Sequence, residues 1–227
     1  MQRKHELRSD KTLANIQELI NQGIKKIAVI MRHSDRFFCE DARMEPFMGL
    51  TSNGKGYAQD MGAQLPTAPV PQMFSSFFGR CIETAYLIDK GYTKAHDKLI
   101  AHNVTCETLA PFYINDLERG IAMVEEQGSL KFIRNWFDGN IDESIMVDPQ
   151  KTAQRLADFM VERLDALDEN EMALCVSHDW NLFPLKEFYL GLKHEEAGDV
   201  GYLEGVIFFE KEGSHFITHY QGKPTAL

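Results

Sequence analysis

Histidine and arginine side chains stand together in the segment KKIAVIMRHSDR. Arg32, His33 and Arg36 follow an apolar run from Ile27 to Met31 that is typical of a buried strand. A neutral imidazole is a nucleophile or base near neutral pH, and a guanidinium binds phosphate oxygens through paired N–H groups. Two guanidiniums around an imidazole therefore indicate a site for a phosphorylated ligand, and phosphate chemistry is the first hypothesis.

Two further segments place polar residues at predicted strand ends. Arg80 lies in SSFFGRCIETA, at the start of a predicted helix, and Ser177-His178-Asp179 directly follows another apolar run. In open α/β sheets, functional residues gather beyond the carboxyl ends of the strands. We therefore expect all three segments to meet in one crevice.

The elements that must position these residues alternate between strands and helices. Pattern and end signals predict helices over 10–22, with Asp10 as N-cap, and over 53–65, 80–90 closed by Gly91, 117–127, 129–137, 149–167 and 180–190. Strands are predicted over 26–31, 72–75, 102–106, 172–176, 205–210 and 215–220. This order predicts an α/β fold, a three-layer αβα sandwich with a mostly parallel sheet and an antiparallel edge. We expect one domain over 1–227, with a small inserted cap at about 111–148.

Composition limits the partners. The formal net charge is −10 and there is no basic tract, which argues against nucleic acid or an anionic membrane as partner. No apolar run is long enough for a membrane span and the N-terminus does not resemble a signal peptide, so a cytoplasmic protein is expected. The four cysteines form no CxxC pair, so we expect reduced thiols, no metal and no cofactor.

Four segments, in order, resemble the motifs of one family. MRHSDR resembles the RHG-x-R signature of the histidine phosphatase superfamily, which has the phosphoglycerate-mutase-like fold. LTSNGKGYAQDMGAQL, SSFFGRCIETA and VSHDWNL resemble three later segments of that family. The resemblance extends from about Ile27 to about Leu192, with little match over 111–148. Arg36 and the His178-Asp179 pair resemble the histidine acid phosphatase branch more closely.

The resemblance implies a role for each residue. His33 would attack phosphorus and carry the phosphoryl group, and His178 would bond that group during transfer. A carboxyl group must protonate the leaving alkoxide, and Asp179 is favoured over Glu107 for this role. Ser34 stands where the family has glycine, and its hydroxyl could bind a phosphate oxygen. The guanidiniums expected to neutralise the phosphate are Arg32, Arg36 and Arg80.

The predicted activity is metal-independent hydrolysis of a phosphomonoester of a small metabolite through a phosphohistidine. Two alternatives stay open, a mutase-like phosphotransferase and a non-catalytic phosphoryl-binding protein of the same fold. The segment after Glu107 lacks the mutase-type ERHYG signature, which argues against a sugar-phosphate mutase. The oligomeric state is not predicted.

Two further sets of residues have candidate roles of their own. Arg119, Lys131 and Arg134 are possible contacts for a second anionic group of the substrate. His215 and His219 share one face of a predicted strand and could bind a metal, but no third ligand lies near them in sequence, so solvent-facing histidines are expected.

Overall fold

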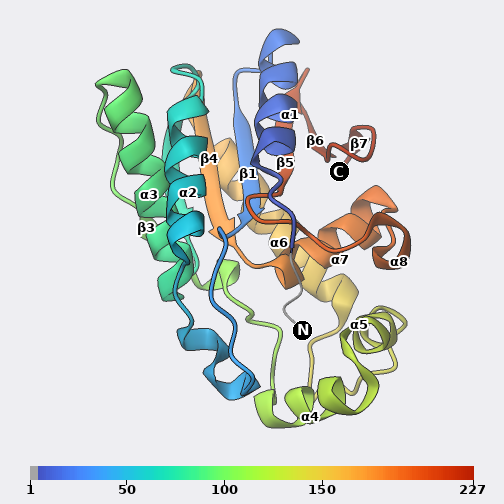
Figure 1. Cartoon of the computed structure of the whole chain (residues 1–227). Helices are drawn as coiled ribbons and strands as arrows, with labels where there is room; N and C mark the ends of the chain where they lie inside the picture. The colour runs from blue at the N-terminus through green and yellow to red at the C-terminus, as the bar shows by residue number, and fades with distance from the viewer. Residues whose placement is uncertain (1–4) are drawn as a thin grey trace.

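A seven-stranded sheet forms the centre of the computed structural model, which describes residues 5–227. The strand order is β3-β2-β4-β1-β5-β6-β7 (Figure 1). The first four strands in that order are parallel, and β5, β6 and β7 run antiparallel. The strands are β1 (Ile27–Arg32), β2 (Val70–Ser75), β3 (Val104–Thr105), β4 (Glu171–Ser177), β5 (Gly205–Lys211), β6 (Ser214–Thr218) and β7 (Thr225–Ala226). The predicted α/β sandwich with an antiparallel edge is confirmed.

Helices cover both faces of the sheet, because successive residues of a buried strand point to opposite sides. Ile27 and Val29 of β1 pack with one set of helices, whereas Ala28 and Ile30 pack with the other. The first face carries α1 (Ser9–Asn21), α2 (Ser52–Gln64) and α3 (Gly79–His96). The second carries α6 (Pro149–Asp165) and α7 (Asp179–Leu190).

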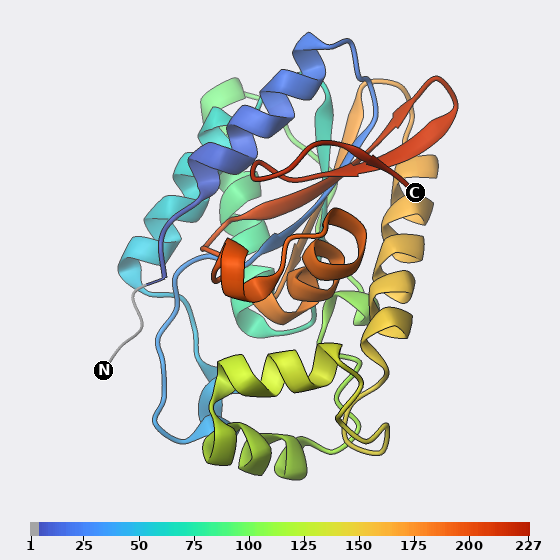
Figure 2. The ribbon, with the colours of Figure 1, turned by 90° about the vertical axis from the view of Figure 1, so that its right-hand side faces the viewer.

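Short elements gather at the carboxyl edge of the parallel strands. The α4–α5 segment lies below this edge, apart from the main body of the sheet (Figures 1 and 2). Its aromatic residues Phe132 and Trp136 nevertheless join the core cluster of α6 and α7. The elements of this edge are η1 (Ala42–Phe47), η2 (Glu107–Leu109), α4 (Leu117–Gln127), α5 (Ser129–Phe137) and α8 (His194–Ala197).

Several predicted ends are wrong, and the structure shows why. Helix α3 continues past Gly91 to His96, because Gly91 is a packing residue and not a helix end. An added Cβ at Gly91 would lie 2.0 Å from the carbonyl oxygen of Gln59 in α2. Helix α1 begins at Ser9, so Asp10 lies in its first turn and is not its N-cap. The predicted strand at 102–106 shortens to two residues.

Three glycines of α2 and α3 lie so close to a neighbouring backbone that side chains are excluded, two of them where the helices meet each other. At each of these glycines an added Cβ would lie 2.0 Å from a carbonyl oxygen. Gly54 faces the carbonyl of Asp35, Gly62 that of Ile88, and Gly91 that of Gln59. Gly54 thereby brings α2 against the loop that follows His33. The loop after β1 and the helix that carries Arg80 are consequently held against the same helix, α2.

Across the residues that the structure describes, no helix combines the length and the apolar character needed to cross a membrane.

Replacing Gly91 tests this packing. Gly91→Ala should lower the free energy of unfolding by about 2 kcal/mol, because the backbone of α2 must move to admit the methyl group. The control is Gly56→Ala, also in a helix, where a Cβ meets nothing within 4 Å. That variant should gain up to about 1 kcal/mol from helix propensity alone. Denaturant unfolding measures both changes, and equal effects would contradict the packing argument.

Candidate active site

The predicted motifs converge at the carboxyl edge of the sheet. Arg32 ends β1, His178 follows β4, and Arg80 lies in the first turn of α3, after β2. Strands β2, β4 and β1 are adjacent in the sheet, which brings the three segments side by side. The ring centroids of His33 and His178 are 5.6 Å apart.

Arg32 is a buried cation with several partners. Its side chain is 1% exposed; Nη2 lies 3.1 Å from Asp179 Oδ2, and Nη1 donates to the Val200 carbonyl at 2.6 Å. The guanidinium also lies over the Tyr202 ring, 4.4 Å from its centroid. A buried charge is tolerated when it is paired and hydrogen-bonded, and these contacts meet that condition.

His33 is held as a neutral imidazole with one defined free nitrogen. Its Nδ1 lies 2.7 Å from the Ser34 carbonyl oxygen, which only accepts, so Nδ1 carries the proton. Burial, and then the charges of Arg80 and Arg32, lower the pKa of His33 well below its ordinary value. The lone pair is therefore on Nε2, the arrangement that a nucleophile requires.

His178 and Arg80 form a second pair. Arg80 Nη2 donates to His178 Nδ1 at 3.1 Å, so His178 is protonated on Nε2, which lies 3.0 Å from Ser76 Oγ. Burial, followed by the charge of Arg80, lowers the pKa of His178 to about 3. Both ring nitrogens have protein partners, so His178 must exchange Ser76 for a phosphoryl oxygen when it bonds one.

Glu45 of η1 is part of the site, although no motif or spacing in the sequence indicates it. Its carboxylate forms an ion pair with Arg36, and its Oε1 accepts from the Cys39 N–H at 2.7 Å. Arg80 Nη1 lies 3.2 Å from the carbonyl oxygens of both Glu45 and Pro46. Two of the three predicted phosphate-binding arginines thus contact one short segment of the chain.

The two candidate acids occupy different environments. Burial raises the pKa of Asp179, but the charge of Arg32 and the neighbouring His178 outweigh it, so that the pKa lies below its ordinary value. Asp179 also begins α7, where its Oδ1 accepts from the Trp180 N–H at 3.0 Å. Glu107 begins η2 as an exposed residue and lines the same cleft.

Ser34 contacts α2 and α3. Its hydroxyl donates to the Gly54 carbonyl at 2.7 Å, and its backbone N–H donates to Thr84 Oγ1 at 3.1 Å. The hydroxyl proton that would bond a phosphate oxygen is therefore engaged with Gly54. In this structure Ser34 holds the loop after β1 in place.

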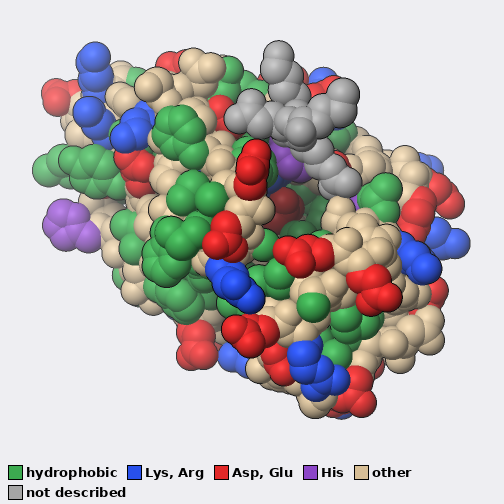
Figure 3. All heavy atoms as spheres, turned by 60° about the horizontal axis from the view of Figure 1, so that its bottom comes forward, with side chains coloured by type: hydrophobic (Ala, Val, Ile, Leu, Met, Phe, Trp, Pro, Cys, Tyr) green, Lys and Arg blue, Asp and Glu red, His purple; other side chains and the backbone are tan. Residues whose placement is uncertain are grey.

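A cleft of about 520 Å³ opens at this edge, and Arg36, Arg80, His178 and Asp179 form part of its wall. Figure 3 looks onto the edge and shows the hollow, with histidine, acidic and hydrophobic side chains around it. His33 lies deeper, with 2% of its surface exposed. Carboxylates hold Arg32 and Arg36 at this site, whereas backbone carbonyls hold Arg80.

Comparison with known proteins identifies the family. The model of the histidine phosphatase superfamily (branch 1) matches residues 29–200. The chain belongs to the histidine phosphatase superfamily. Because the match is to branch 1, the likeness of Arg36 and the His178-Asp179 pair to the acid phosphatase branch is confined to those positions. No curated protein sequence matches the chain significantly.

Several solved structures share the fold of this chain. Phosphoglycerate mutase from Bacillus anthracis is 17% identical at a TM-score of 0.60, over 87% of this chain and 94% of that one. A mycobacterial glucosyl-3-phosphoglycerate phosphatase is 14% identical at a TM-score of 0.57, over 88% of this chain and 96% of that one. A phosphoserine phosphatase from Entamoeba histolytica is 18% identical at a TM-score of 0.52, over 85% of this chain and 94% of that one. These likenesses show the shared fold.

A cysteine nucleophile does not fit this site. Cys81 lies at the site, but burial raises the pKa of its thiol to about 12. Its Sγ donates to the Ser177 carbonyl at 3.4 Å, so the thiol remains protonated.

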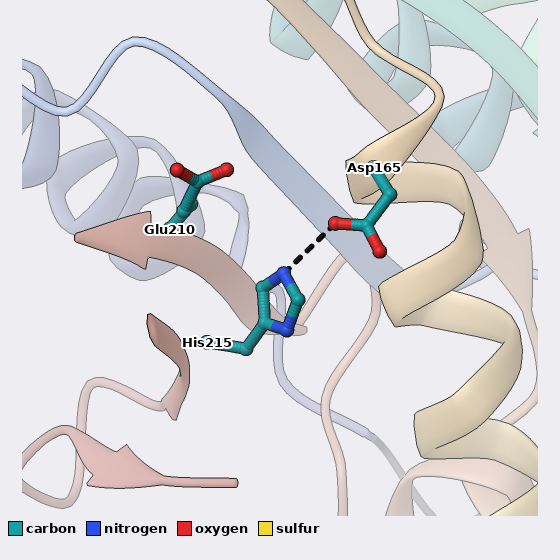
Figure 4. Close-up of side chains that lie close together, drawn as sticks. All are labelled: Asp165, Glu210 and His215. Atoms are coloured by element: carbon teal, nitrogen blue, oxygen red, sulfur yellow. Dashed lines mark hydrogen bonds and ion pairs between the residues drawn. The ribbon is translucent and has the colours of Figure 1, made fainter. Parts of the chain in front are cut away.

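One group of possible metal ligands lies at the opposite edge of the sheet. Asp165, Glu210 and His215 bring one ligand atom each within 4.8 Å of the others (Figure 4). His215 Nε2 and Asp165 Oδ1 are 2.8 Å apart, so these two side chains are hydrogen-bonded to each other. The expectation that His219 faces solvent is wrong: it is 1% exposed and bonds the buried Glu204 at 3.0 Å.

Two of the basic residues proposed for a second anionic group are engaged elsewhere. Arg134 bonds the carboxylates of Glu187 and Glu195, and Arg119 bonds Ser144 Oγ at 3.2 Å. Neither they nor Lys131 are among the described residues that line the cleft.

The Glu45–Arg36 ion pair predicts a gain in anion affinity when the carboxylate is removed. Glu45→Gln should tighten the binding of inorganic phosphate about three- to tenfold, because the phosphate no longer competes with a fixed negative charge. The control Glu40→Gln changes the net charge equally at an exposed position of the same loop. Calorimetric titration with phosphate measures the change. Weaker binding in Glu45→Gln would show that Glu45 supports the site and does not compete with the ligand.

Proposed function

We propose that this histidine phosphatase hydrolyses phosphomonoesters of small molecules, without a metal ion, through a phosphohistidine on His33. The observation that carries the proposal is the neutral His33 imidazole, with its proton fixed on Nδ1 and its Nε2 free beside Arg32 and Arg80. A phosphate dianion repels nucleophiles, and fixed guanidiniums reduce that barrier by neutralising its oxygens.

The first step transfers the phosphoryl group to the protein. His33 Nε2 attacks phosphorus, the P–O bond to the leaving group breaks, and a bond from Nε2 to phosphorus forms. Arg32, Arg36 and Arg80 would hold the phosphoryl oxygens, and the Nε2–H of His178 would donate to one of them. This requires the arginines to exchange their present carboxylate and carbonyl partners for phosphate.

Asp179 is the proposed general acid, with Glu107 as the alternative. In the free protein the ion pair with Arg32 favours the carboxylate form of Asp179. A bound dianion shares Arg32 and brings negative charge nearby, which raises the pKa of Asp179 and favours its protonation. After the alkoxide takes the proton, the carboxylate of Asp179 would accept a proton from the water that attacks the phosphohistidine.

The small phosphorylated substrate and the cytoplasmic location expected from the sequence remain predictions.

Loss of the nucleophile tests the proposal directly. His33→Ala should lower the hydrolysis of an aryl phosphate, assayed in excess chelator, at least about a thousandfold. It should also abolish the acid-labile phosphoenzyme trapped by quenching. His215→Ala, at the opposite edge of the sheet, is the matched control and should retain activity. Unchanged turnover in His33→Ala, or a requirement for added Mg²⁺, would reject the mechanism. Phosphate binding without turnover would favour a non-catalytic role. Transfer of the phosphoryl group to an added alcohol would favour a mutase-like role.

The choice of acid is tested by leaving groups of different basicity. Asp179→Asn should reduce kcat for alkyl phosphates by about 10²–10⁴-fold, because an alkoxide needs the proton. It should affect nitrophenyl phosphate much less, since that leaving group departs without a proton. Glu107→Gln should show no such difference between the two substrates. The reverse pattern would assign the acid to Glu107.

A further inference from the structure

The part of the cleft beyond the phosphate-binding groups is apolar. Arg36, Glu45, Arg80 and His178 form one connected polar cluster, and Asp179 follows His178 in the chain. Glu107 is the other charged residue of the lining. The remaining lining residues are Ala42, Pro46, Phe77, Phe78, Ala110, Pro111, Phe112, Tyr113, Ile114, Leu117, Ile121 and Trp180. With the phosphoryl group at His33, this wall offers an apolar surface to the rest of the substrate.

A second cavity, of about 200 Å³, continues from the cleft under helix α4. The two share Ile114, Leu117, Ile121 and Trp180, as well as Ala42. The cavity extends to Gly120, Val124, Phe132 and Met146, and Glu125, an exposed residue, is its charged member. An apolar cavity of this size holds water poorly, so an apolar group gains free energy by entering it.

A polar or doubly anionic substrate finds little to bind in this region. Arg119, Lys131 and Arg134 do not line the cleft or the cavity. Glu107, in the cleft wall, would repel a second anionic group. The wall thus selects against sugar phosphates and bisphosphates, whose hydroxyl or phosphate groups would lose water without gaining partners.

We infer that the substrate is a phosphomonoester with an apolar leaving group, such as an alkyl chain or an aromatic ring, whose far end enters the cavity beneath α4. The inference rests on the proposed function for the position of the phosphoryl group. The polar groups at one end of the cleft set the orientation of the substrate. The apolar contact area at the other end sets which phosphomonoesters are preferred.

A graded set of substrates tests the preference. Alkyl phosphates of two, four, six and eight carbons should rise in kcat/KM by roughly three- to fourfold for each buried methylene, until the cavity is full. Glycerol phosphate, a hexose phosphate and phosphoserine should be poor substrates. A flat alkyl series, or a preference for the polar esters, would overturn the inference while leaving the phosphatase mechanism intact.

Variants locate the preference in the cavity. Gly120→Leu adds a side chain into it, and the backbone accepts one, since a Cβ there meets Ile145 Cγ2 at 4.0 Å. The ratio of kcat/KM for octyl over ethyl phosphate should fall at least about tenfold. Leu117→Asp, at a half-exposed position of the shared wall, should lower the same ratio. The control Ala122→Leu enlarges an exposed residue of α4 outside the lining and should leave the ratio unchanged.

Binding separates failure of this inference from failure of the proposed function. Octyl phosphonate cannot be hydrolysed, and calorimetry should show it binding the wild-type protein at least about tenfold more tightly than ethyl phosphonate. That result would support the apolar site even if no ester in the panel is hydrolysed. Equal affinities would overturn the apolar site whether or not the protein is a phosphatase.

Discussion

The buried guanidinium of Arg32 is the constraint around which the site is built. A cation removed from water needs opposite charge and hydrogen-bond acceptors, and without them it would be strongly destabilising. Asp179 at the start of α7 provides the charge, and the Val200 carbonyl, before β5, provides an acceptor. Strands β4 and β5 flank β1 in the sheet, so the guanidinium ties together chain segments from both sides of the strand that carries it.

The same electrostatic balance governs the whole pocket. Three arginines lie at one edge of a protein whose formal net charge is −10. Asp179 and Glu45 compensate two of them within the protein itself, and the imidazoles of His33 and His178 remain neutral. The free site therefore resembles a phosphate site in which carboxylates hold the place of the ligand. In the proposed mechanism, a phosphate dianion would replace these carboxylates as the partner of Arg32 and Arg36.

Much of the fold and of the site could be predicted from the sequence because both depend on local patterns. The apolar run before Arg32 and the one before His178 identify buried strands, and parallel strands bring their ends together. Long-range contacts leave no such pattern. Val200 is 168 residues from Arg32, and Glu45 lies in the short helix η1, which no hydrophobic periodicity marks. Gly91 was misread as a helix end because its role depends on a neighbouring helix. His219 follows β6 and bonds the buried carboxylate of Glu204, a contact that its sequence neighbours do not indicate.

The two ends of the cleft differ in how freely their amino acids can change. Helices α2 and α3, which hold the loop after His33 and carry Arg80, meet at glycines that leave no room for a side chain. In α4, by contrast, Gly120 is the fully buried residue, and the neighbouring positions are exposed or half-buried. Mutations in α4 can therefore alter which molecules are bound at little cost in folding. A protein divided in this way can acquire new ligands over evolutionary time while its reaction chemistry stays constant.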